Sequence, residues 1–227
     1  MPRLLLTWPE GLAHQTRPGS LVSADISGFT ALSERLAAKG REGAEELTSV
    51  INDCFTGMID DCDRHGGDVL KFGGDALLVF FEGDRHTERA CRAAQAMRKT
   101  IKSPRRTTDG KRVQLAVSIG AHSGEFDLFV VRNGHDELLV SGPGSSATVD
   151  AEAAANAGEI LLTATAAAML PTSWLGRATP DGVLLARVFG SSRLPPGEPP
   201  LRRPAEFVPP EQAAQILAGA ANEHRQV

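Results

Sequence analysis

The sequence predicts an α+β domain in which helices pack on one face of a mostly antiparallel sheet. Its apolar segments follow one another as strand, helix, helix, hairpin, helix and strand, and further strands and helices come after them. The hairpin is the clearest signal, because only Gly73-Gly74-Asp75 separates the apolar runs 68–72 and 76–81. This order, with an antiparallel pair at its centre, fits an α+β sandwich.

The elements before the hairpin follow from local patterns. A short strand over 21–25 ends on an acid, Asp25, and a helix opens after Gly28 with apolar residues on one face. The clearest helical period runs over 47–62, where apolar residues recur at steps of three and four before Gly66-Gly67 ends the helix. We expect this stripe to be buried against the sheet.

The elements after the hairpin are expected from the same kinds of pattern. They are a helix over 90–101, strands over 113–121, 126–131 and 138–141, an alanine-rich helix over 147–157, and strands over 160–162 and 183–185.

Length and composition indicate one domain with a tail. The chain has 227 residues, of which 41% are hydrophobic and 23% charged, and this balance excludes wholesale disorder. We expect an N-terminal lead-in at 1–20, one domain at 21–190, and a proline-rich linker at 191–227 that carries a short helix over 211–221.

Charge and cysteine content narrow the class of protein. With 24 basic and 28 acidic side chains, the formal charge is −4, which argues against binding to nucleic acid or an anionic membrane by bulk electrostatics. The apolar run Leu4-Leu5-Leu6 is far shorter than a signal peptide core or a membrane span. Three scattered cysteines fit reduced thiols. We therefore expect a cytoplasmic protein without a membrane span or a nucleic-acid partner.

Two acidic residues stand at strand ends that the expected sheet would bring together. Asp25 ends one strand and Asp75 lies in the glycine turn that opens another, so neighbouring strands would bring both carboxylates to one end of the sheet. Such a pair repels unless a cation or a shared proton intervenes, and Mg²⁺ prefers oxygen ligands of this kind. Taken alone, each aspartate also fits an ordinary helix cap or turn residue.

A phosphate site is expected beside Asp25. The backbone amides of Ser27, Gly28, Phe29 and Thr30 lie at the start of a helix, where unpaired N–H groups favour phosphate, and glycine lets the backbone approach closely. A metal pair beside a phosphate cradle indicates chemistry on a nucleoside triphosphate.

Two motifs carry a family resemblance: ADISGFT at residues 24–30 and GDVLKFGGDALL at residues 67–78. In sequence and separation they resemble the class III adenylate/guanylate cyclase catalytic domain, from about residue 21 to about residue 163. The chain looks most like the first cyclase domain of bicarbonate-regulated soluble adenylyl cyclases and their bacterial relatives. The motif Phe72-Gly73-Gly74-Asp75 is also similar to one in diguanylate cyclases, but those continue with Glu-Phe where Ala76-Leu77 stand here.

The resemblance implies a ferredoxin-like class III cyclase fold and a set of roles. Asp25 and Asp75, helped by the carbonyl of Ile26, would hold two Mg²⁺ ions, for which Mn²⁺ can substitute. Residues 27–30 would bind the β- and γ-phosphates. Lys71 would contact the edge of the purine base and favour adenine. The family reaction converts ATP to cyclic AMP and pyrophosphate at an interface between two cyclase domains.

The chain departs from the family where the partner's residues are expected. The family supplies an Asn and, four residues later, an Arg; these positions fall on Ser146 and Asp150, and the base-reading position falls on Leu139. A homodimer is therefore expected to be inactive or nearly so, and a second, complementary cyclase domain would complete the site. The alternative is a catalytically deficient cyclase-homology domain that senses a nucleotide or regulates through dimerisation.

Overall fold

The computed structural model describes residues 2–73, 75–103, 115–132 and 136–189, together with two short strands. The helices are η1 (Arg3–Thr7), α1 (Phe29–Ala37), α2 (Arg41–Arg64), α3 (His86–Lys102), α4 (Pro143–Ala154), α5 (Ala164–Ala168) and η2 (Thr172–Trp174). The strands are β1 (His14–Ser27), β2 (Asp68–Gly73), β3 (Ala76–Glu82), β4 (Arg105–Arg106), β5 (Arg112–Val113), β6 (Ala116–Arg132), β7 (Asp136–Ser141), β8 (Ile160–Leu162), β9 (Leu175–Thr179) and β10 (Gly182–Leu185). The expected helix over 211–221 lies outside the described residues.

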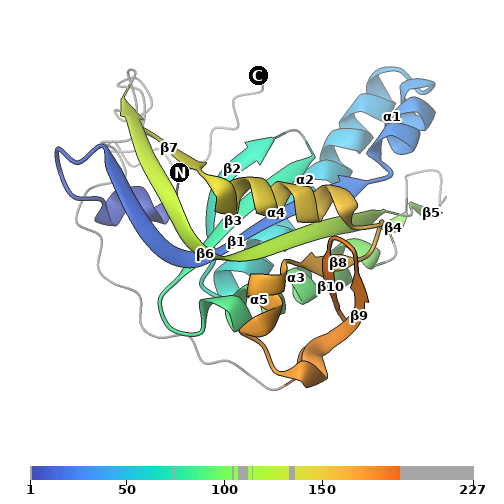
Figure 1. Cartoon of the computed structure of the whole chain (residues 1–227). Helices are drawn as coiled ribbons and strands as arrows, with labels where there is room; N and C mark the ends of the chain where they lie inside the picture. Colours follow the sequence, from blue (N-terminus) through green and yellow to red (C-terminus); the bar gives the residue numbers. More distant parts are fainter. Residues whose placement is uncertain are drawn as a thin grey trace.

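One mixed sheet organises the described chain (Figure 1). Its strand order is β2-β3-β1-β6-β8-β10-β9, and β7 also pairs with β6. Every pairing is antiparallel except that of β6 with β8, which is parallel. The predicted α+β class, with its mostly antiparallel sheet, is confirmed.

The two faces of the sheet are covered by different elements. Val22, Ala24 and Ile26 of β1 point into a core that also holds the apolar stripes of α2 and α3, so these helices cover one face. Leu21 points the other way, into a second core with η1, β2 and β7. Helix α4 also lies on this opposite face, in front of β1 and β6 (Figure 1).

The close approach of α4 to the sheet depends on Gly120. A Cβ atom at this position of β6 would clash with the backbone of Thr148 and Glu152 in α4. The absence of a side chain therefore lets the helix lie directly against the strand, and this contact sets where the residues of α4 stand relative to β1.

The predicted helical stripe and hairpin are both present. Val50, Cys54, Met58 and Cys62 are buried along α2, which is longer than the expected stripe at both ends. Strands β2 and β3 pair in antiparallel register, with an irregularity between Val69 and Lys71.

The N-terminal part of the sheet extends further than expected. Strand β1 begins at His14 rather than at Leu21, because its polar first half pairs with β6 from His14↔Phe129 onward. Before it, Leu4, Leu5 and Trp8 are buried. These residues, expected to be a lead-in, thus pack on the sheet.

Three further boundaries differ from expectation. The two strands expected over 113–121 and 126–131 are one continuous strand, β6, because both halves pair with β1. Helix α4 begins at Pro143 and ends at Ala154, before the expected end at 157. Strand β9 was not expected, and it pairs with β10.

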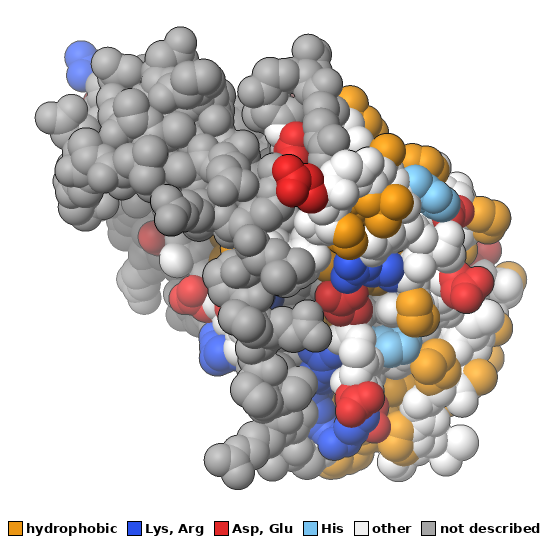
Figure 2. Space-filling view, turned by 90° about the vertical axis from the view of Figure 1, so that its left-hand side faces the viewer, with side chains coloured by type: hydrophobic (Ala, Val, Ile, Leu, Met, Phe, Trp, Pro, Cys, Tyr) orange, Lys and Arg blue, Asp and Glu red, His pale blue; other side chains and the backbone are white. Residues whose placement is uncertain are grey.

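The surface is mixed in character. On the face shown in Figure 2, acidic, basic and hydrophobic side chains are interspersed over the described residues. Each described helix is too short or too polar to cross a bilayer.

Candidate functional site

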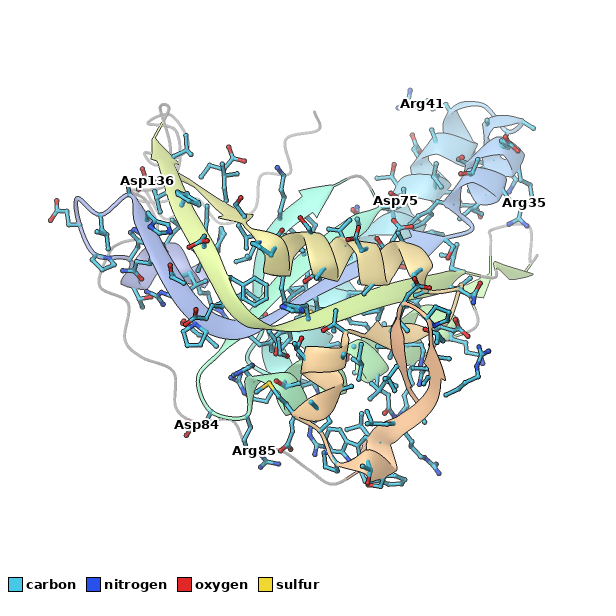
Figure 3. All side chains as sticks on the ribbon, in the orientation of Figure 1. Arg35, Arg41, Asp75, Asp84, Arg85 and Asp136 are labelled. Carbon is cyan, nitrogen blue, oxygen red and sulfur yellow. The ribbon has the colours of Figure 1, made fainter. Side chains whose placement is uncertain are left out.

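Strands β1 and β3 bring Asp25 and Asp75 together. Asp25 pairs in register with Ala76, the residue after Asp75, and the backbone N–H of Ile26 donates to the carbonyl of Asp75 at 3.1 Å. The turn after β2 is thereby fixed to the end of β1. Figure 3 shows Asp75 at the end of the sheet where α1 begins.

The two carboxyl groups are close enough to share a hydrogen bond. Burial first, and then the negative charge of Asp75 and this hydrogen bond, raise the pKa of Asp25 above its ordinary value. Two carboxyls in this relation favour either a proton between them or a bound cation. The juxtaposition predicted from the sequence is therefore present.

The donor set suits a hard divalent cation. Asp25 and Asp75 offer carboxylate oxygens, and Ile26, whose side chain is buried, can offer only its backbone carbonyl. Within the described residues, no three His, Cys, Asp or Glu side chains form a group that could hold a metal. Mg²⁺ commonly combines one or two protein carboxylates with water and phosphate oxygens, which fits this donor set.

A third carboxylate, which sequence analysis missed, lies near the pair. Ser118, the β6 neighbour of Asp25, donates from Oγ to Oε1 of Glu152 at 3.4 Å. Burial and then the charge of Asp25 raise the pKa of Glu152. No motif marks this residue; only the contact of α4 with Gly120 places it here.

The start of α1 has the features of a phosphate cradle. Gly28, the N-cap residue, has φ of +99°, a left-handed conformation that glycine adopts readily, and no side chain caps the helix. The amides of the first turn therefore have no intrahelical acceptor. Phe29 packs against the core, which holds the turn in place, and Thr30 is exposed. Ser27 ends β1 and points its hydroxyl at the carbonyl of Ala116.

Lys71 lies on the same hairpin as Asp75. Its side chain is exposed, and its Nζ stands 3.9 Å from Oε1 of Glu137 on β7. The ammonium group is thus accessible on the side of the sheet where β7 lies.

Helix α4 presents no cation. Ser146 and Asp150 are both exposed and, four residues apart, share one face of the helix. Leu139 on β7 is partly buried and pairs with Phe129. The exposed face of α4 therefore offers a hydroxyl and a carboxylate.

The family comparison decides between the interpretations of the two motifs. The model of the adenylate and guanylate cyclase catalytic domain matches residues 13–180. The chain belongs to this family. The class III cyclase resemblance, and the fold that it implied, are confirmed.

The individual relatives include both adenylyl and guanylyl cyclases. Rat (Rattus norvegicus) adenylate cyclase type 10 is 38% identical over 79 residues, which is 34% of this chain but only 5% of the relative. The adenylyl cyclase CyaB from P. aeruginosa has a TM-score of 0.63 at 24% identity, covering 80% of this chain and 98% of that one. The guanylyl cyclase domain of the RhoGC fusion protein from Blastocladiella emersonii has a TM-score of 0.64 at 20% identity, covering 76% and 95%. At these identities the two structures show the fold alone.

Proposed function

We propose that this cyclase domain is the metal-contributing half of an adenylyl cyclase site and forms cyclic AMP and pyrophosphate from Mg-ATP together with a second cyclase domain. The observation that carries the proposal is that Asp25 and Asp75 lie next to each other at the end of β1, beside the uncapped start of α1. A carboxylate pair and free amides next to one another suit a metal-bound triphosphate.

Each residue of this half has a distinct role. Asp25, Asp75 and the carbonyl of Ile26 would hold two Mg²⁺ or Mn²⁺ ions, which would supply positive charge to the attacking and leaving oxygens. The amides of residues 27–30 bind the β- and γ-phosphates and so orient the pyrophosphate as the leaving group. Lys71 contacts the edge of the purine and favours adenine.

The reaction is an in-line displacement at the α-phosphorus. The ribose 3′-oxygen loses its proton to water and forms the new P–O bond, while the bond from the α-phosphorus to the bridging oxygen breaks and pyrophosphate leaves. Negative charge rearranges around the α-phosphorus in this step, and a cation from the partner domain would stabilise it.

A homodimer would lack that cation. Loss of one preorganised donor lowers the rate by roughly 10²–10³-fold. Asp150 places a carboxylate at the position of the family's Arg, and like charges at close range repel. Ser146 can donate one hydrogen bond but cannot reproduce the amide of Asn. These two positions support a pairing with a different cyclase domain.

The test is cyclic AMP formation by the full chain, alone and mixed with a cyclase domain that carries the Asn and Arg. The expected result is product from the mixture and little or none from the chain alone. The matched control is the Asp25→Asn chain, which should form no cyclic AMP in the same mixture. A mixture that binds Mg-ATP but forms no cyclic AMP would overturn the proposal.

Asp150 also favours a second candidate function, a regulatory domain that binds a nucleotide without turning it over. This function predicts saturable Mg-ATP binding and no product in any pairing. Under it, replacing both Asp25 and Asp75 by Ala would leave dimerisation unchanged while abolishing nucleotide binding.

A further inference from the structure

Glu152 of α4 lies on the same face of the sheet as the carboxyl group of Asp25. Ser118 pairs in register with Asp25, and residues paired in this way in antiparallel strands share one face. The Oγ of Ser118 donates to Oε1 of Glu152 at 3.4 Å, which places this carboxyl group on that face. At Gly120, two residues further along β6, the backbone of Glu152 comes close to the strand. The docking of α4 therefore brings Glu152 to the pair of Asp25 and Asp75.

The three carboxyl groups interact through their charges. Burial, and then the charge of Asp25, raise the pKa of Glu152; the hydrogen bond from Ser118 lowers it, and the charge of Asp75 raises it further. Burial and the charge of Asp75 likewise raise the pKa of Asp25. Like charges held together in this way make ionisation unfavourable, and a cation between them would relieve the repulsion.

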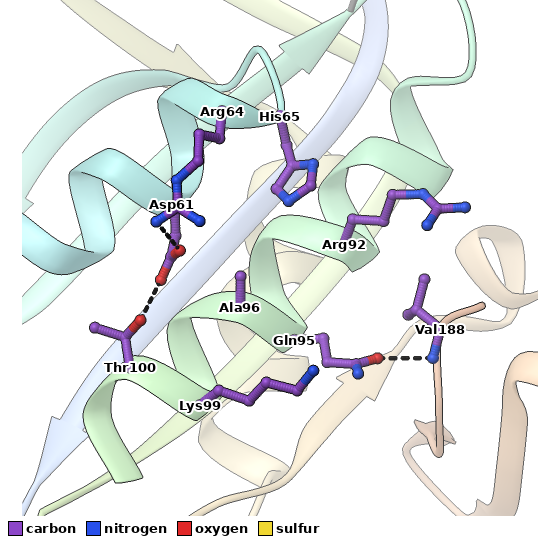
Figure 4. A pocket seen from close by; sticks show the side chains of 9 residues that line it. All are labelled: Asp61, Arg64, His65, Arg92, Gln95, Ala96, Lys99, Thr100 and Val188. Carbon is purple, nitrogen blue, oxygen red and sulfur yellow. Dashed lines mark hydrogen bonds and ion pairs between the residues drawn. The ribbon is translucent and has the colours of Figure 1, made fainter. Parts of the chain in front are cut away.

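A carboxylate in another part of the molecule shows a different kind of compensation. Asp61 lines a cavity of about 410 Å³ between α2 and α3 (Figure 4). Its Oδ1 lies 2.7 Å from Nη2 of Arg64, and its Oδ2 accepts from Oγ1 of Thr100 at 2.6 Å. The charge of Asp61 is thus offset by an arginine of its own helix, whereas the charges that act on Glu152 are those of other carboxylates.

Glu152 approaches the proposed metal site from a different element than the two aspartates do. Asp25 and Asp75 lie at adjoining strand ends, while Glu152 belongs to α4 and is held by Ser118 of β6. Side chains that surround the direct ligands of an ion commonly hydrogen-bond to those ligands, and their substitution changes metal affinity by roughly 10–100-fold. Mg²⁺ usually keeps several water molecules among its ligands, and these are donors that a carboxylate can accept from.

We propose that Glu152 is a positioning residue of the metal site, which accepts a hydrogen bond from a water ligand of an ion held by Asp25 and Asp75 and so strengthens the binding of that ion. This inference rests on the proposed function, because it takes the two aspartates as the metal site. Glu152→Gln tests it well, since the amide oxygen can still accept from Ser118 while the negative charge is removed.

The test measures Mn²⁺ binding by the full chain, without nucleotide or partner domain. Free Mn²⁺ is followed by its electron paramagnetic resonance signal, and binding is followed by calorimetry. Glu152→Gln should weaken Mn²⁺ binding by roughly tenfold or more. Ser118→Ala should weaken it by less, because Glu152 keeps its charge. Glu125→Gln, the same substitution at an exposed glutamate of β6, is the matched control and should bind like the wild type.

Melting temperatures in EDTA separate this role from a merely structural one. Glu152→Gln removes a like charge from beside Asp25, so the metal-free variant should melt at or above the temperature of the wild type. A structural role predicts the opposite pattern, in which the metal-free variant melts at a lower temperature and its Mn²⁺ affinity is unchanged.

Three results would overturn this proposal. The first is wild-type Mn²⁺ affinity in Glu152→Gln, and the second is an equal loss of affinity in Glu125→Gln, which would indicate a general effect of surface charge. The third is an absence of Mn²⁺ binding by the wild type. Failure of the proposed function is a different observation, because it would be seen as a mixture with the complementary cyclase domain that binds Mg-ATP and forms no cyclic AMP.

Discussion

Replacing Asp75 by Asn should stabilise the metal-free domain at neutral pH. The folded protein holds the carboxyls of Asp25 and Asp75 within hydrogen-bond distance, and this proximity contributes to the raised pKa of Asp25. Two unit charges at about 4 Å interact by about 4 kcal/mol at an effective dielectric constant of 20. Because Asp25 is partly exposed and Asp75 exposed, solvent screening reduces the expected gain to about 1 kcal/mol. For a chain of this size, that corresponds to roughly 2–4 °C in melting temperature.

The pH dependence of this gain has a definite sign. A raised pKa means that the folded state holds its proton more tightly than the unfolded state. Wild-type stability therefore falls as the pH rises from the ordinary value of 3.8 through the raised pKa of Asp25. The advantage of Asp75→Asn should be present at neutral pH and should vanish below pH 3.8, where Asp25 is protonated in both proteins.

The assay is thermal unfolding with EDTA and with saturating Mg²⁺, followed by tryptophan fluorescence. Mg²⁺ should raise the melting temperature of the wild type and have little effect on Asp75→Asn, since a ligand stabilises only the state that binds it. Asp53→Asn, an exposed aspartate of α2, is the matched control and should behave as the wild type in both conditions. A variant that melts below the wild type in EDTA, or that keeps the full Mg²⁺ effect, would refute the reasoning.

Three further predictions concern Ser146 and Asp150 at the positions of the family's Asn and Arg, the proposed contact of Lys71 with the purine base, and the packing of α4 on β6. The double variant Ser146→Asn/Asp150→Arg should raise cyclic AMP formation by the chain alone by at least about 10²-fold, because it restores donors to the developing charge. In the mixture with the complementary cyclase domain, Lys71→Ala should lower kcat/KM for ATP more than for GTP, and it should leave the melting temperature unchanged, since its exposed 3.9 Å ion pair contributes little. Gly120→Ala should destabilise the domain by about 1–3 kcal/mol in urea unfolding, because its Cβ meets the α4 backbone, whereas Gly73→Ala, with nothing within 4 Å of its Cβ, should cost far less.

Each of these predictions has a contrary outcome. No gain from the double variant, with Mg-ATP still bound, would mean that α4 does not face the reacting phosphate. An equal loss of ATP and GTP turnover in Lys71→Ala would remove its role in base selection. Equal stability of the two glycine variants would mean that the backbone of α4 does not approach Gly120 of β6 as closely as described.

The sequence predicted the parts of this fold that local patterns encode. The α2 stripe and the hairpin at Gly73-Gly74-Asp75 each show their period or turn within a few residues. The meeting of Asp25 and Asp75 also followed, because each stands at a strand end and the two strands are neighbours.

Non-local pairing accounts for what the sequence did not predict. The first half of β1, from His14 to Ser20, is polar and contains Pro18 and Gly19, so no apolar run marks it; its partner is a segment of β6 more than a hundred residues away. Ser123 and Gly124 similarly resemble a turn, although β6 runs through them. Glu152 reaches the acidic pair only because α4 docks on the sheet, which no pattern in the helix reveals.

Anomalous diffraction from crystals grown with Mn²⁺ and a non-hydrolysable ATP analogue would test the metal-site claim most directly. The account predicts two Mn²⁺ peaks about 3.5–4 Å apart, each touching oxygens of both Asp25 and Asp75, with the analogue's terminal phosphates at the start of α1. Bound nucleotide with no manganese at these aspartates, or with manganese held by other side chains, would contradict it.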